Sequence, residues 1–238
     1  MIKIAHVYNN LLNLYGSWGN LAVLERYLTE SGYEVSLNSF SVGGYSNLSD
    51  YDLIYLGAGT ESRMLQALSD FKRFHADIKQ YLKDDRKILA TGNSMAILGE
   101  KVTDDGSVYE GASVIDISTV IGSNRNYSEL ILSSRLNDHP VIGNINSSIT
   151  ITYGKDPVFF DILSQSVGNR KQEGVQKGSI YATELSGPLL VRNPYLLHSF
   201  CEVLVEKALP MNTNEWFATA LNGYSSSLAT LKKQLKHH

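Results

Sequence analysis

The most chemically suggestive segment of this 238-residue sequence is Gly92-Asn93-Ser94-Met95-Ala96. It follows a short apolar run at residues 88–91 that is typical of a buried strand, and small residues then make a sharp turn toward a helix. Such a strand-turn-helix holds a reactive side chain above the edge of an α/β sheet. The form Gly-x-Ser-x-Ala differs at one position from the serine hydrolase elbow Gly-x-Ser-x-Gly. Ser94 is therefore one candidate nucleophile, of a hydrolase or amidase.

A serine nucleophile needs a base, and the histidines offer none in a recognisable triad context. His139, next to Asp138, lies in a predicted loop. The other histidines fall on a predicted strand, on predicted helices or at the C-terminus: His6, His75, His198, His237 and His238. A hydrolase that uses Ser94 thus stays an alternative interpretation.

Two further segments contain residues that suit ligand binding. Gly57-Ala58-Gly59 follows a predicted strand, and glycine turns expose backbone amides to anions, but the segment lacks a P-loop lysine and the third glycine of a dinucleotide motif. Arg125, after Asn124, either grips a carboxylate or is a solvated loop residue. Asp104-Asp105 precedes Gly106 and is explained as part of a hairpin turn.

Composition excludes several classes of protein. The single cysteine, Cys201, allows no intrachain disulfide and no cysteine-rich metal site, and we expect it to act as a buried apolar residue. A net charge of -3 gives no reason to expect nucleic acid as a partner. No apolar run approaches the ~20 residues of a membrane span, and the first residues form a strand pattern without a signal peptide. We expect a cytoplasmic protein without metal or cofactor.

Strand and helix patterns alternate in the first half of the chain. We expect strands at residues 2–8, 34–40, 53–56 and 87–91, and helices at 20–31 and across 65–78. This alternation predicts an α/β fold with a mainly parallel central sheet flanked by helices. Ligands in such folds bind beyond the carboxyl ends of the strands, where the turns at Gly57 and Gly92 would lie.

The second half is richer in strand patterns. We expect a hairpin around Asp105-Gly106 and strands at 130–133, 149–153 and 179–185. Asn193-Pro194 is typical of a helix start, with an N-cap followed by proline, and the helix should extend to about Ala208. A last helix is expected at 215–235. Without a linker or repeat, residues 1–238 are predicted to form one domain.

Four segments together resemble class I glutamine amidotransferases of the cobyric acid synthase type, which have a flavodoxin-like fold. The likeness is greatest to the glutaminase subunit of lipid II isoglutaminyl synthase. The segments are Leu12-Asn13-Leu14-Tyr15-Gly16-Ser17-Trp18-Gly19-Asn20, Tyr55-Leu56-Gly57-Ala58-Gly59-Thr60-Glu61, the Gly92 turn with Leu98-Gly99, and Leu185-Ser186-Gly187-Pro188. Their order and spacing cover nearly the whole chain.

The resemblance implies a chemistry that this sequence does not retain. In the family a cysteine attacks the glutamine side chain, a histidine transfers the proton, and backbone amides of the glycine-rich loop and the elbow hold the oxyanion. The cysteine position is Gly92 here, and the histidine of Leu-His-Gly-Pro is Ser186. The pocket glutamine becomes Ala96, and residues 145–148 replace an Asn-His-Gly-Gly stretch.

We therefore expect a degenerate amidotransferase-like protein, a pseudoenzyme that binds or regulates a Mur-ligase-like synthetase partner in peptidoglycan precursor modification. Gly57, Ala58, Gly59, Asn93 and Arg125 would be the remaining substrate-binding positions. One alternative is the Ser94 hydrolase, and another is a sensor that holds a small amide or amino acid in the old glutamine pocket.

Overall fold

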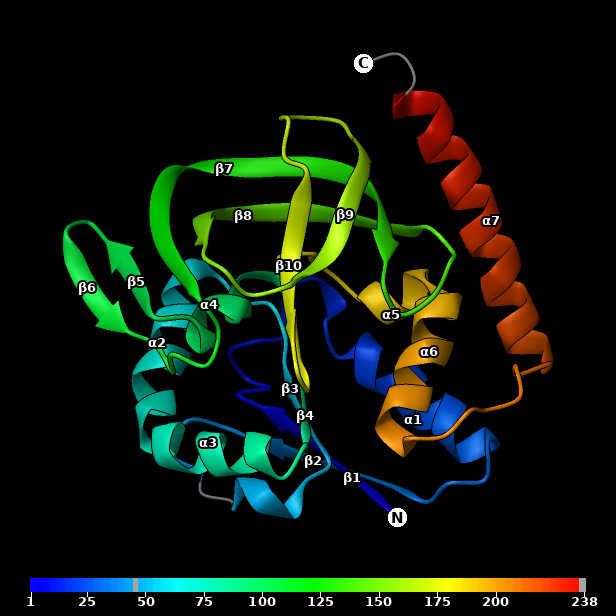
Figure 1. Cartoon of the computed structure of the whole chain (residues 1–238), viewed down its shortest axis with the longest axis horizontal. Coiled ribbons are helices and arrows are strands. Elements are labelled where there is room, and N and C mark those ends of the chain that lie inside the picture. The colour runs from blue at the N-terminus through cyan, green and yellow to red at the C-terminus, as the bar shows by residue number, and fades with distance from the viewer. Residues whose placement is uncertain (45–46, 236–238) are drawn as a thin grey trace.

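The computed structural model describes residues 1–44 and 47–235 and has a long mixed sheet at its centre (Figure 1). The strand order is β2-β1-β3-β4-β11-β10-β9-β7-β5-β6, and β8 pairs with β7. The parallel part contains β1 (Ile2–Val7), β2 (Val35–Phe40), β3 (Leu53–Leu56), β4 (Lys87–Thr91) and β11 (Ile180–Thr183). The predicted strands of the first half are thus confirmed to within one or two residues.

The parallel strands are buried on both faces because helices cover both. Ile54 and Ile88 pack with α2 (Glu61–Phe71) and α3 (His75–Lys83). The alternate residues, Leu53 and Leu89, pack with α1 (Gly19–Glu30) and α6 (Pro194–Val205) on the other face. The period of two along each strand sends successive side chains into two separate cores. The structure confirms the predicted α/β class with helices flanking a central sheet.

The second half extends this sheet with mostly antiparallel strands. They are the hairpin β5 (Lys101–Asp104) and β6 (Ser107–Glu110), the long pair β7 (Ile117–Ser134) and β8 (Val141–Tyr153), and β9 (Val158–Gln165) with β10 (Gln172–Lys177). β7 and β8 are much longer than predicted, and β9 and β10 were not predicted. Residues 122–127 of β7 are exposed and polar, so they lack the apolar alternation that marks a strand.

The C-terminal helices pack beside β8. They are the short α5 (Leu189–Arg192), α6, and α7 (Glu215–Leu235). The predicted start at Pro194 is confirmed, with Asn193 at the N-cap position as predicted, although the Asn193 side chain makes no cap hydrogen bond. The Asn193 amide instead accepts from the Ile142 amide and donates to the Ile142 and Leu189 carbonyls. These hydrogen bonds hold the start of α6 against β8.

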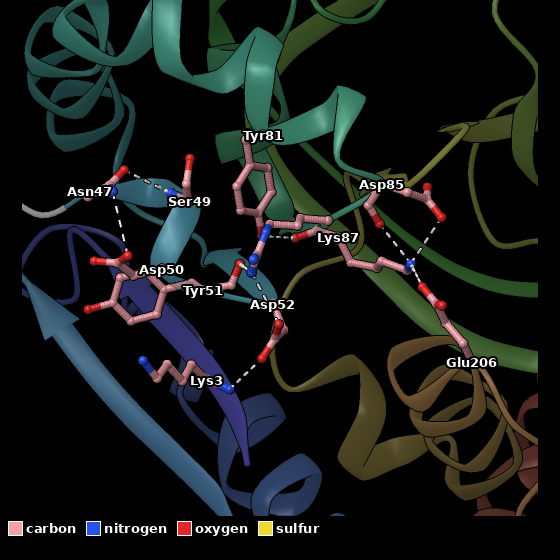
Figure 2. A network of polar contacts seen from close by, with 11 residues as sticks. Lys3, Asn47, Ser49, Asp50, Tyr51, Asp52, Tyr81, Asp85, Lys87 and Glu206 are labelled. Carbon is pink, nitrogen blue, oxygen red and sulfur yellow. Dashed lines mark hydrogen bonds and ion pairs between the residues drawn. The ribbon is translucent and has the colours of Figure 1, made fainter.

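A charged network closes the end of the sheet where the parallel strands begin (Figure 2). Lys87, at the start of β4, is buried and its ammonium lies 2.5 Å from Glu206 and 3.3 Å from Asp85. Arg86 pairs with Asp52, whose other carboxylate oxygen accepts from the Lys3 amide. These contacts join the end of α6 to the strands and leave the opposite, carboxyl ends of the strands for the turns that follow.

A second charged cluster is buried where β10 meets β11. Glu173 is fully buried and accepts hydrogen bonds from the Thr183 hydroxyl and the Glu184 amide. Glu184 is 2% exposed and accepts from Arg170 at 2.5 Å and from the Tyr153 hydroxyl at 3.2 Å. Burial, with the Glu184 charge as a second cause, raises the pKa of Glu173 to about 7.

Glu173→Gln should therefore change how stability depends on pH. The folded pKa of about 7 lies above the ordinary value of 4.5, so the folded protein binds more protons than the unfolded chain between these pH values, and its stability falls as pH rises. The glutamine variant cannot titrate at this position. Its free energy of unfolding should therefore rise by about 3 kcal/mol relative to that of the native chain between pH 4.5 and 7. Urea unfolding at pH 5 and pH 8 measures it. Parallel pH profiles for the two proteins would contradict the assignment.

Candidate functional site

The turn after β4 is a sharp elbow, as the sequence predicts. It consists of η4 (Gly92–Ser94) and α4 (Met95–Leu98). Gly92 has φ +72°, a conformation that favours glycine. A β-carbon added at Gly92 would lie 2.6 Å from the β-carbon of Ala58. The direction in which a side chain would leave the elbow is therefore filled by the neighbouring glycine-rich turn.

Ser94 points into the protein. Its side chain is fully buried, and the hydroxyl shares its proton between the Leu56 carbonyl at 3.0 Å and the Thr91 carbonyl at 3.1 Å. These two carbonyls end β3 and β4. The hydroxyl therefore joins the ends of two neighbouring strands, and solvent does not reach it.

Asn93 holds the elbow against the turn that follows β3. Its carbonyl oxygen accepts from the Gly59 amide at 3.0 Å, and its amide group donates to the Gly59 carbonyl at 2.8 Å. Both groups are buried, where hydrogen bonds are strong and hard to replace. Of the predicted binding residues, the structure thus brings together Asn93, Gly59 and Ala58.

A loop from the N-terminal segment packs over the glycine-rich turn. The Ser17 hydroxyl accepts from the Ala58 amide at 3.0 Å, and the Leu14 amide donates to the Ala58 carbonyl at 2.8 Å. A β-carbon at Gly57 would collide with the Leu12 carbonyl oxygen. The amides of Ala58 and Gly59 therefore both have partners within the protein.

Tyr55 connects the elbow, this loop and helix α1. Its hydroxyl accepts from the Asn20 side chain at 2.8 Å, donates to the Ser17 carbonyl at 2.9 Å and lies 2.9 Å from the Thr91 hydroxyl. Neither Tyr55 nor Ser17 was predicted as a site residue. Both residues stand in the motif segments. A tyrosine in an apolar strand is usually a core residue, and its hydroxyl partners come from segments distant in sequence, so the local pattern did not mark either residue as part of the site.

Arg125 lies at the exposed end of the same region and is occupied by protein groups. Its guanidinium donates to the Tyr15 hydroxyl at 2.9 Å and to the Asn146 side chain at 3.0 Å. Its other nitrogen lies 3.6 Å from the Glu61 carboxylate, which also accepts from the Ser148 amide. Glu61 was not predicted as a site residue, although it stands in one of the motif segments.

Ser186 is buried beside β8, where its amide donates to the Asn144 carbonyl. Gly187 follows with φ +81°, and a β-carbon there would contact the Tyr15 carbonyl oxygen. Pro188 in turn packs against Gly19. The Ser186 segment and the N-terminal loop thus lie against each other.

The histidines are used elsewhere. His6 is buried 5.3 Å from the Tyr55 ring, and burial lowers its pKa to about 4. His139 stacks on Tyr195, and His198 hydrogen-bonds Tyr27. Within residues 1–44 and 47–235, no histidine hydrogen-bonds Ser94. His237 and His238 lie outside the described residues.

Among the cavities of the described surface, two have volumes of about 940 and 780 Å³. Glu61 lines the first and Arg125 the second, but neither is lined by Gly57, Gly92 or Ser186.

The described side chains contain no group of three or more potential metal ligands. None of the described helices has the length and apolar character that a membrane crossing requires.

Known proteins with similar sequences include subunits of lipid II isoglutaminyl synthase and a cobyrinate a,c-diamide synthase. Lipid II isoglutaminyl synthase (glutamine-hydrolyzing) subunit GatD of Staphylococcus aureus is 24% identical over 90% of this chain and 89% of its own length. The subunit GatD of Streptococcus pneumoniae is 23% identical over 87% and 81%. A cobyrinate a,c-diamide synthase of Picrophilus torridus is 27% identical over 48% of this chain and 24% of its own length.

Solved structures agree on the fold. PurLQS of Thermotoga maritima matches with a TM-score of 0.56 at 10% identity, over 86% of this chain and 96% of the other. A glutamine amidotransferase of Thermotoga maritima matches with a TM-score of 0.52 at 11% identity, over 99% and 97%. The family model of the CobB/CobQ-like glutamine amidotransferase domain matches residues 3–194. This chain therefore belongs to the CobB/CobQ-like glutamine amidotransferase family.

Proposed function

We propose that this protein is a glutamine amidotransferase-like subunit without glutaminase activity. The observation that carries the proposal is the contact between Gly92 and Ala58. The elbow position that holds the family's nucleophile has no side chain, and the β-carbon of Ala58 occupies the space that a side chain would need. A catalytic cysteine requires both the thiol and room for it above the elbow.

The backbone amides near the elbow support the same proposal. Transition-state stabilisation needs donors aimed at the site where negative charge develops. The Ala58 amide donates to Ser17 and the Gly59 amide donates to Asn93. A substrate oxyanion would have to displace two buried partners to reach these donors.

A hydrolase that uses Ser94 has little structural support. The hydroxyl is buried and bonded to two strand carbonyls, and its described surroundings offer no histidine as a base. A sensor that uses the old glutamine pocket is also poorly supported. The Arg125 guanidinium, which would grip a ligand carboxylate, is engaged by Glu61, Asn146 and Tyr15.

We propose a synthetase subunit as partner, because the relatives named GatD are subunits of lipid II isoglutaminyl synthase. By this analogy the partner is Mur-ligase-like and acts on a cell-wall precursor. Exposed apolar side chains beside the elbow would form part of the contact: Trp18 is 57% exposed, Tyr15 42% and Val191 41%. Val191 lies against Gly19, the residue after Trp18, so the two segments that carry these side chains are in contact. Exposed tryptophan and tyrosine are typical of interface centres.

The native chain should release no glutamate from glutamine above background, with or without a Mur-ligase-like partner. Gly92→Cys alone should also stay inactive and lose at least about 2 kcal/mol of folding free energy, because cysteine there combines a positive φ with the Ala58 contact. Adding Ala58→Gly should recover part of that loss. Glutamate release and urea unfolding measure the two effects.

The triple variant Gly92→Cys, Ala58→Gly, Ser186→His tests whether the family's catalytic groups restore activity. Glutamate release from it would support loss of the family's catalytic groups from an otherwise retained scaffold. Release by the native chain would overturn the inactive-subunit proposal.

Ser94→Ala should reduce stability without changing any activity. Removing a buried hydroxyl that donates to strand carbonyls costs about 1–2 kcal/mol. Thermal unfolding and turnover of amide and ester substrates provide the measurements. An activity of the native chain that disappears in Ser94→Ala, with the fold intact, would instead establish the hydrolase.

Trp18→Glu should weaken binding to the synthetase partner at least about tenfold, because it puts a charge where an aromatic anchor is proposed. Val108→Glu is the matched control, since Val108 is 62% exposed on the distant β5–β6 hairpin. Calorimetry with a purified Mur-ligase-like synthetase measures the affinities. Equal affinities for both variants would rule out the face that contains Trp18.

A further inference from the structure

The 780 Å³ cavity lies among the long strands of the second half, away from the elbow. Figure 1 shows β9 and β10 crossing the β7–β8 ribbon, and all four strands contribute to its lining. Its volume lies within the range of about 300–1,000 Å³ that small-molecule sites occupy. Of the predicted substrate-binding residues, only Arg125 lines this space.

One wall of the cavity is aliphatic. Ile145, Ile149 and Ile151 stand on the same face of β8, and Leu130 on β7 joins them. Ile151 is half-buried, and the other three are buried behind it. The neighbouring Asn146 hydrogen-bonds Arg125, which lies at one edge of the cavity.

The rim of the cavity is also apolar, although it faces solvent. Tyr127 is 52% exposed and Val167 is 64% exposed, and both line the opening. Covering the half-buried Ile151 and these exposed side chains with a ligand's hydrocarbon body would remove apolar surface from water, which is favourable. The ligand must therefore have an apolar part.

The opposite part of the lining is cationic. Arg170 and Lys171 lie just before β10, and Arg125 lies at another edge. Arg170 is paired with the lining carboxylate Glu184, and Arg125 is paired with Glu61. In the described part of the chain, the Lys171 ammonium has no hydrogen-bond or ion-pair partner.

Arg170 is held in place from behind. Of its guanidinium nitrogens, only Nη2 donates hydrogen bonds in the described residues, to Glu184 at 2.5 Å and to the Tyr153 hydroxyl at 3.1 Å. Its Nε and Nη1 atoms have no hydrogen-bond partner among residues 1–44 and 47–235. A guanidinium fixed at one nitrogen, with its remaining N–H groups free, is pre-organised to bind a carboxylate or a phosphate.

We propose that this cavity binds an amphiphilic anion, with its carboxylate or phosphate head at Arg170 and Lys171 and its aliphatic body along Ile151 and the apolar rim. The site is independent of the elbow, so it stands or falls separately from the inactive-subunit proposal. Arg170 provides the geometry for the head, and Lys171 adds an unpaired charge.

Calorimetry of the full chain with four probes, each below its micelle concentration, tests the proposal. Decanoate and decyl phosphate separate the two head groups, decyltrimethylammonium has a similar tail with the opposite charge, and acetate lacks the tail. We expect saturable binding of at least one anionic decyl probe, and none of acetate or the cation. Failure of both anionic probes to bind, or equal binding of the cation, would overturn the proposal.

Variants then locate the head group. Arg170→Lys should weaken binding about tenfold, because it keeps the charge beside Glu184 but loses the free guanidinium N–H groups. Lys171→Gln should weaken it about threefold, as expected for one exposed charge. Lys101→Gln, an exposed lysine on β5, is the matched control. The unpaired Lys171 can be changed without exposing a buried partner. Affinities for both cavity variants equal to that of Lys101→Gln would place the anion elsewhere and contradict the proposal.

Discussion

The close approach of two turns at the carboxyl ends of β3 and β4 determines what this protein can do. Gly59 and Asn93 exchange two buried hydrogen bonds, which holds the turns together, and Ala58 then lies directly in front of Gly92. The N-terminal loop fixes the arrangement from outside, through Ser17 and through the Tyr55 hydroxyl. In such a packed site a side chain on Gly92 requires movement of a whole turn, and packed interiors resist that movement.

The same framework is compatible with the proposed loss of catalysis in a well-formed fold. The strands before the turns are buried on both faces, and their cores do not depend on the catalytic groups. Ser94 and Asn93 act as structural ties between strand ends. On our proposal, the family's scaffold is kept for binding a partner, and its reaction centre has been filled by ordinary packing.

The sequence predicted the parallel half of the fold well, because apolar runs such as 53–56 and 87–91 are short, complete and separated by helical periods. It predicted the long β7–β8 pair poorly. The middle of β7 is polar and exposed, and its strand character comes from pairing with β8, which no local pattern reveals. At the site, the motif segments pointed to Gly57, Gly92 and Asn93. Ser17, Tyr55 and Glu61 take part in the site through contacts between segments that are distant in sequence. The steric role of Ala58 appears only in three dimensions.

The closed state of the turns is tested most directly by following the backbone amide signals of Ala58, Gly59 and Gly92 by NMR while L-glutamine is added. The account predicts that these signals stay unchanged to millimolar glutamine, because Ser17 and Asn93 already occupy the Ala58 and Gly59 amides. Saturable shifts at these three amides, accompanied by the appearance of glutamate, would show an open and working site and would contradict the account.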